Sequence, residues 1–79
     1  MARVLLFGRL TDLAGWRERV VEATSLAELR DLLRADDAEL GEALAGPGVQ
    51  VAVDKAIVRG EAILAAATEV AFLPPMSGG

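Results

Sequence analysis

Residues 69–79 read Glu-Val-Ala-Phe-Leu-Pro-Pro-Met-Ser-Gly-Gly. The first five of these residues are typical of a buried β-strand. Two prolines end the strand, because proline supplies no N–H to a strand ladder and holds the chain extended. Residues 3–7, Arg-Val-Leu-Leu-Phe, form a second dense apolar run. Since these two runs are the richest in aliphatic residues, we expect them to lie side by side at the centre of one sheet.

The segment that follows the first run predicts a loop, a strand and a helix. Residues 9–15 contain several turn-forming residues and predict a structured loop. Residues 16–23 predict a strand whose three consecutive charges suit the edge of a sheet. Ser25 and Glu28 match the capping-box pattern at a helix start, and leucines at helical spacing follow. The sequence therefore predicts a helix over residues 26–35.

The middle of the chain predicts a short helix and then a change to strands. Asp36 with Glu39 repeats the capping pattern and predicts a short second helix, which the Gly-Pro pair beyond it ends. Residues 49–53 alternate with period two and predict a strand, and a two-residue turn leads into a short strand at residues 56–58. Residues 61–68 are compatible with either helix or extended chain.

This order of elements predicts an α+β roll, with a mixed sheet of four to five strands crossed by one main helix plus a short second helix. If the first and last strands pair in parallel, the helix serves as the crossover connection that such a pair requires. The length of 79 residues allows one domain. We expect that domain to span residues 1–73, with an extended C-terminal tail over residues 74–79.

The composition excludes several classes of function. The chain has no cysteine and no histidine, so it offers no thiol or imidazole nucleophile and no His/Cys metal site. Its formal net charge of −4 and its scattered basic residues argue against nucleic-acid binding. No apolar run approaches the ~20 residues of a membrane span, nor does the N-terminus match a secretory signal. We expect a cytoplasmic protein that binds no metal and no cofactor itself.

The C-terminus is the remaining candidate for chemistry. The acidic cluster between Asp36 and Glu42 is explained as a helix start, and Lys55 as a turn residue. Six extended residues from Pro74 reach about 20 Å, enough to carry a terminal carboxylate into another protein. Glycine lets the backbone thread a narrow channel. That carboxylate, with a pKa of about 3.5, needs activation, as by an adenylate, which a partner must supply. The alternative is a frayed tail.

The sequence resembles the small subunits of molybdopterin synthase, the MoaD-like branch of the ubiquitin-like β-grasp sulfur carriers. The Glu-Val-Ala-Phe-Leu-Pro-Pro-x-Ser-Gly-Gly ending is the most specific part of this resemblance. The other matching residues are Arg3–Phe7, Leu10, Leu13, Gly15, Leu29, Arg30, Leu33 and Val51–Asp54.

The resemblance implies that an ATP-using, MoeB-like enzyme adenylates Gly79 and that sulfur then replaces AMP to leave a thiocarboxylate. It also implies a MoaE-like large subunit, in which the sulfur passes to cyclic pyranopterin monophosphate. Such synthases are heterotetramers, and the catalytic side chains belong to the large subunit. The tail residues implied to insert into that subunit are Pro74, Pro75, Met76, Ser77 and Gly78.

Family members dock their partners through an exposed apolar patch on the sheet, and the matching positions are Phe7, Ile57 and Leu73. Alternation along the first strand places Phe7 opposite Val4 and Leu6, whereas the sequence does not choose a face for Ile57. The alternative is that Phe7 and Ile57 are ordinary core residues. The chain departs from its relatives at residues 66–68, where they carry an Asp-Gly turn.

Two other functions remain open at this point. The chain could carry sulfur for another pathway, such as thiamine thiazole, cysteine or tRNA thiolation. It could also be a ubiquitin-like tag that forms isopeptide bonds through Gly79.

Overall fold

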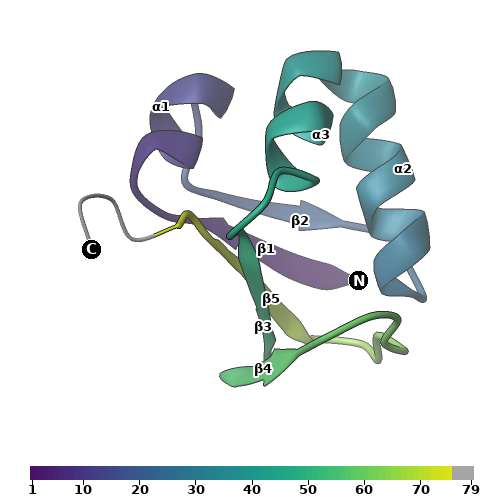
Figure 1. Cartoon of the computed structure of the whole chain (residues 1–79). Coiled ribbons are helices and arrows are strands. Elements are labelled where there is room, and N and C mark those ends of the chain that lie inside the picture. The colour runs from purple at the N-terminus through teal and green to yellow at the C-terminus, as the bar shows by residue number, and fades with distance from the viewer. Residues whose placement is uncertain (76–79) are drawn as a thin grey trace.

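A computed structural model describes residues 1–75 and shows a five-stranded sheet with three helices on one face (Figure 1). No helix in this part of the chain is long and apolar enough to cross a bilayer. The strands are β1 (Ala2–Leu6), β2 (Glu18–Val21), β3 (Gln50–Val53), β4 (Ala56–Val58) and β5 (Glu69–Leu73). The helices are α1 (Arg9–Ala14), α2 (Leu26–Asp36) and α3 (Ala38–Leu44). This architecture confirms the predicted α+β roll with a mixed sheet.

The order of strands across the sheet is β2-β1-β5-β3-β4. β1 and β5 lie at the centre and run parallel, with Val4 opposite Val70 and Leu6 opposite Phe72. The other three neighbouring pairs are antiparallel. The prediction that the two most aliphatic runs pair at the centre is therefore confirmed. β2 lies at an edge, as its run of charges indicates.

The start of α2 is capped by residues from two distant parts of the chain. The Ser25 hydroxyl accepts a hydrogen bond from the Glu28 N–H at 3.1 Å, as predicted. The Glu28 carboxylate reaches back to the Thr24 N–H at 2.7 Å, so the second half of the predicted capping box is shifted by one residue. The Glu61 carboxylate accepts from the Ala27 N–H at 3.0 Å. These bonds satisfy donors that a helix start leaves without intrahelical partners.

The second helix is present, but its predicted cap is wrong by one residue. Asp37, not Asp36, is the residue before α3, and its carboxylate accepts from the Leu40 N–H at 3.2 Å. Asp36 ends α2 and forms an ion pair with Arg19 at 2.7 Å. The two acidic residues therefore have structural roles, as the interpretation of the acidic cluster expected.

The prediction of a loop over residues 9–15 is wrong, because Arg9–Ala14 forms the short helix α1. Leu10 is buried at 3% exposure and anchors this turn of helix in the core. The Thr11 hydroxyl donates to the Leu6 carbonyl oxygen at 3.0 Å. Tertiary packing around one leucine therefore outweighs the local turn preference of the segment.

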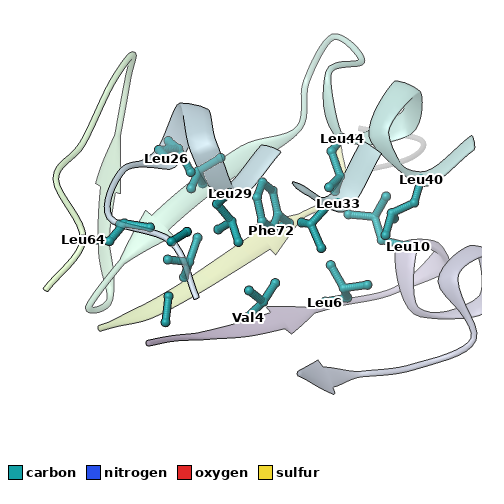
Figure 2. Packing of buried hydrophobic residues seen from close by; sticks show 14 residues of the cluster. Val4, Leu6, Leu10, Leu26, Leu29, Leu33, Leu40, Leu44, Leu64 and Phe72 are labelled. Carbon is teal, nitrogen blue, oxygen red and sulfur yellow. The ribbon is translucent and has the colours of Figure 1, made fainter. Parts of the chain in front are cut away.

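The core lies between the helices and the covered face of the sheet (Figure 2). Phe72 and Val4 are fully buried there, and Leu29 of α2 packs into the same cluster. Removing each such side chain from water contributes roughly 1.5–3 kcal/mol. The residues of this cluster are Ala2, Val4, Leu6, Leu10, Ala23, Leu26, Leu29, Leu33, Leu40, Leu44, Val51, Leu64, Val70 and Phe72.

The β3–β4 hairpin forms where the sequence predicts it. Its two turn residues, Asp54 and Lys55, have φ values of 48° and 71°. Positive φ at both central residues is the geometry of a type I′ turn, whose twist matches that of the flanking strands. Lys55 is therefore a turn residue, as predicted.

Residues 59–68 form neither a helix nor a named strand. Ala67 adopts φ +65°, so an alanine takes the left-handed conformation in the turn before β5. Its N–H donates to the Met1 carbonyl oxygen at 2.9 Å, and Thr68 accepts from the Arg3 N–H at 2.8 Å. These two bonds align the start of β5 with β1 and thereby help to set the register of the central pair.

Candidate functional site

The sheet has one face covered by helices and an outer face that no other element of residues 1–75 covers (Figure 1). Val4 and Leu6 point to the covered face and are 0% and 2% exposed. Leu5 alternates with them and points to the outer face. Phe7, directly after β1, is 45% exposed. The prediction that Phe7 lies opposite the core residues of β1 is therefore confirmed.

An apolar band crosses the outer face over four strands. The register places Leu5 beside Ala71, Ala71 beside Ala52, and Ala52 beside Ile57. Ile57 is 49% exposed, which answers the question of its face. The half-buried Leu73 completes the surface at the end of β5. We call this surface the outer-face patch and define it as Leu5, Phe7, Ala52, Ile57, Ala71 and Leu73. Ala52 and Ala71 are only 7% and 6% exposed, so Phe7, Ile57 and Leu73 supply most of its accessible surface.

Charged side chains of both signs border the outer-face patch. Arg17 and Glu18 line the same surface hollow as Leu5 and Phe7. Glu18 lies beside Leu5 in the strand register and forms an ion pair with Arg3 at 3.6 Å. The patch therefore has apolar side chains at its centre and charged side chains at its border.

The chain leaves the sheet beside this patch. β5 ends at Leu73, and Pro74 and Pro75 follow as half-buried residues. Because β5 is parallel to β1, this exit lies next to the connection from β1 to α1. Because β5 is antiparallel to β3, the exit also lies next to the connection from α3 to β3 (Figure 1).

Four of the predicted tail residues, Met76, Ser77, Gly78 and Gly79, lie outside the described residues. Their assigned roles stay predictions, and so does the proposed division of the chain at residue 73. The structure does bring three of the other predicted site residues to one surface. Phe7 and Leu73 follow equivalent positions on adjacent strands, and Ile57 lies across β3 from them.

One titratable group among residues 1–75 has a clearly shifted pKa, and it has a structural role. The pKa of Glu61 is lowered, first by the Ala62 N–H that donates to it at 2.8 Å and then by the Ala27 N–H. This carboxylate caps α2 and lies apart from the outer-face patch. Within residues 1–75 no three His, Cys, Asp or Glu side chains come together as metal ligands.

Sequence reasoning missed two residues at the exit, Gly8 and Gly48. Both contact the prolines that follow β5, as described below. The only signal for Gly8 was its place at the end of an apolar run, and Gly48 follows a Gly-Pro pair that reads as a helix stop. Neither pattern indicates contact with a segment so distant in the sequence.

The fold is that of the ubiquitin-like β-grasp proteins, and three solved structures illustrate it. SAMP1 from Haloferax volcanii is similar with TM-score 0.86 and 24% identity, covering 99% of this chain and 98% of that one. A putative molybdopterin converting factor subunit 1 from Pyrococcus furiosus has TM-score 0.81 and 24% identity, with 95% and 97% covered. A complex of subunits 1 and 2 of molybdopterin-converting factor from Helicobacter pylori gives 0.74 and 22%, with 99% and 97% covered.

At these identities the likeness to solved structures establishes the fold. The family is established independently, because the model of the ThiS family matches residues 4–79; the chain belongs to that family. No match was found among curated proteins. The resemblance to ubiquitin-like sulfur carriers noted from the sequence is thus confirmed.

Proposed function

We propose that the protein is the sulfur-carrying small subunit of a molybdopterin synthase, acting in the cytoplasm. The observation that carries this proposal is the outer-face patch, which ends at Leu73 beside the exit of a chain whose sequence closes with Ser-Gly-Gly. Membership of the ThiS family supports a sulfur carrier. The Helicobacter pylori complex supports a large subunit as the partner, because that protein assembles with a subunit 2.

The chemistry takes place on the terminal carboxylate of Gly79. One carboxylate oxygen attacks the α-phosphorus of ATP on a MoeB-like activating enzyme, pyrophosphate leaves, and an acyl-adenylate forms. Hydrosulfide then adds to the acyl carbon and AMP leaves, which produces the thiocarboxylate. The activation is needed because a carboxylate, ionised above a pKa of about 3.5, is a poor electrophile. In the MoaE-like large subunit the sulfur passes to cyclic pyranopterin monophosphate.

The two regions of the site have separate tasks in this proposal. Phe7, Ile57 and Leu73 bind the partner through the outer-face patch, since exposed apolar surface that gathers in one place marks interaction sites. The tail from Pro74 to Gly78 reaches into the active site of the partner and presents Gly79. The protein thus supplies the terminal carboxylate and the surface that binds the partner, while the partners supply the catalytic side chains and the ATP site.

Two observations favour neighbouring functions that share the activated glycine. The family that matches is named for ThiS, so another sulfur-transfer pathway is the first alternative. The Methanosarcina acetivorans neighbour is a small archaeal modifier protein with TM-score 0.87, so a protein modifier is the second. A modifier and a carrier differ in the nucleophile that attacks the adenylate, an amine in one case and sulfur in the other.

Incubation with the activating enzyme, ATP and a sulfur source tests the proposal. We expect the C-terminal peptide to gain about 16 Da as one oxygen is exchanged for sulfur. The thiolated protein, mixed with the large subunit and cyclic pyranopterin monophosphate, should form molybdopterin. The control is that the same enzyme preparation thiolates a known carrier protein. If it does so and the C-terminal peptide of this protein keeps its mass, the proposal is contradicted. Covalent adducts on lysines of other proteins would favour the modifier.

Deletion of Gly79 provides the matched comparison for that experiment. The deletion should abolish thiocarboxylate formation and leave the unfolding temperature unchanged, because the last strand ends at Leu73. Extension of the chain by one residue should have the same effect, since the terminal carboxylate is then displaced. Molybdopterin formed by either variant would contradict the assignment of Gly79.

A further inference from the structure

Two glycines with positive φ face the two prolines at the exit of the chain. Gly8 has φ +58°, and a Cβ added to it would lie 2.9 Å from Cγ of Pro74. Gly48 has φ +85°, and a Cβ added to it would lie 2.7 Å from Cβ of Pro75. Real Cβ atoms essentially never approach other heavy atoms this closely, so each proline occupies space that only a glycine leaves open.

The strand register explains why these residues meet. Leu6 lies beside Phe72 in the parallel pair, so Gly8, two residues further on, comes beside Pro74. On the other side of β5, Gln50 lies beside Leu73 in the antiparallel pair. Gly48, two residues before Gln50, therefore comes beside Pro75. The exit is held on both sides by continuations of the two strands that flank β5.

Packing replaces hydrogen bonding at this point. Pro74 and Pro75 have no N–H, so neither can donate to the ladder on either side. Their fixed φ makes the chain stiff, and its course beyond Leu73 is then set by what the two rings touch. Both prolines are half-buried, and the backbones of Gly8 and Gly48 supply part of that contact.

We propose that Gly8 and Gly48 are positioning residues that aim the chain leaving β5 toward the partner active site, an inference that rests on the proposed function. A side chain at either glycine displaces its proline and turns the direction of the chain at residue 75. The outer-face patch remains intact in such a variant, so docking continues while delivery of the terminal carboxylate fails. Rates of reactions between bound groups fall by up to about 100-fold for a displacement of about 1 Å.

The protein contains its own controls for backbone strain. Gly15 and Gly60 have φ +85° and +93°, and a Cβ on either would meet nothing within 4 Å. An alanine is therefore strained at all four glycines, whereas it collides with a proline only at Gly8 and Gly48. The experiment compares Gly8→Ala and Gly48→Ala with Gly15→Ala and Gly60→Ala.

The readouts are the unfolding temperature and kcat/KM for ATP–pyrophosphate exchange on the activating enzyme. All four variants should lose thermal stability, and the loss should be larger in Gly8→Ala and Gly48→Ala, where the collision with a proline adds to the strain of positive φ. Activity is therefore compared at a temperature at which all four variants are folded. Only Gly8→Ala and Gly48→Ala should lose about tenfold or more in kcat/KM, with binding to the enzyme nearly unchanged. An equal loss of kcat/KM in all four variants, or an unchanged kcat/KM in Gly8→Ala and Gly48→Ala, would overturn the inference.

A second pair of variants separates the collision from every other effect of the substitution. Pro74→Ala removes the Cγ that collides with a Cβ at position 8, so the double variant Gly8→Ala/Pro74→Ala should return to within about threefold of Pro74→Ala alone. Pro75→Ala keeps the Cβ that collides at position 48, so it should not rescue Gly48→Ala. Rescue of both, or of neither, would contradict the proposed contacts.

A measurement without any enzyme tests the inference independently of the proposed function. The chain has no cysteine, so Asp31→Cys on α2 and Ser77→Cys in the tail give a defined pair of spin labels. The distance distribution should change in Gly8→Ala and Gly48→Ala and stay the same in Gly15→Ala and Gly60→Ala. If the activating enzyme catalyses no ATP–pyrophosphate exchange with the unsubstituted protein, the proposed function is contradicted. If the spin-label distance distribution is unchanged in Gly8→Ala and Gly48→Ala, the positioning role is contradicted.

Discussion

The two faces of the central strands differ in what covers them. On the helix side, Val4 and Phe72 have no exposed surface and hold the sheet to α2. On the outer side, Phe7 and Ile57 keep nearly half of their surface exposed although they are equally apolar. The alternation of a strand thus separates residues that stabilise the fold from residues that are available to a partner, within the same few positions of sequence. The following predictions test that separation, from the largest expected effect to the smallest.

The largest effect is expected on the covered face. Phe72→Ala should lower the free energy of unfolding by about 3–5 kcal/mol, because it removes a fully buried ring and leaves a cavity. The ring is also contacted by the Arg30 guanidinium, 5.5 Å from its centroid. Phe7→Ala, the matched change on the outer face, should cost less than about 1 kcal/mol. Urea denaturation measures both, and equal losses would show that the two faces are energetically alike.

Binding should show the reverse order. Phe7→Asp should weaken binding to the large subunit by at least about tenfold, since it places a charge in an apolar contact. Val20→Asp is the control, because Val20 is 55% exposed on β2 and lies outside the outer-face patch. Calorimetric titration should give an unchanged affinity for the control. A Phe7→Asp protein that binds normally would remove Phe7 from the interface.

The next prediction concerns the turn at Ala67, which aligns β5 with β1 and so helps to decide which residues of the two strands face the core. Ala67→Gly should raise the free energy of unfolding by about 0.5–1 kcal/mol, because glycine adopts φ +65° without the steric cost that alanine carries. Ala65→Gly is the matched control, since Ala65 has no positive φ. The control should be destabilised slightly by the greater freedom of its unfolded chain. Destabilisation of both variants would show that the strain at Ala67 is negligible.

The smallest effect concerns the cap of α2, the helix that covers the inner face. The pKa of Glu61 is lowered from 4.5 by backbone N–H donors, so its ionised form stabilises the fold. That contribution is complete above the ordinary pKa and is lost as the pH falls through the lower folded pKa. Glu61→Gln should therefore lower the unfolding temperature slightly at pH 7, and the difference from the unsubstituted protein should shrink as the pH falls below 4.5.

The parts of the fold that are predictable from sequence are those decided by local pattern. The bounds of β5 and the Ser25 cap followed from apolar runs and from one hydroxyl at a helix start. Helix α1 could not be predicted, because its stability comes from burying Leu10 against distant elements. The reach of Glu61 to the start of α2 is likewise a contact between segments far apart in the chain.

The candidate site divides in the same way. Alternation along β1 predicted that Phe7 lies on the outer side, because one strand determines it. The face of Ile57 required the register of three strand pairs, which no local pattern contains. The contacts of Gly8 and Gly48 with the prolines depend on the same register. Residues 76–79 are assigned from the sequence alone.

The parallel pairing of β1 with β5 also bears on how the molecule is made. Residues 3 and 69 are partners in that pair, so the two middle strands of the sheet come from opposite ends of the chain. Pairings between residues so distant in sequence slow folding, because a long loop must close before they form. During synthesis residues 69–73 must leave the ribosome before this pair can assemble, so a product cut short before residue 69 would lack β5 and with it the outer-face patch.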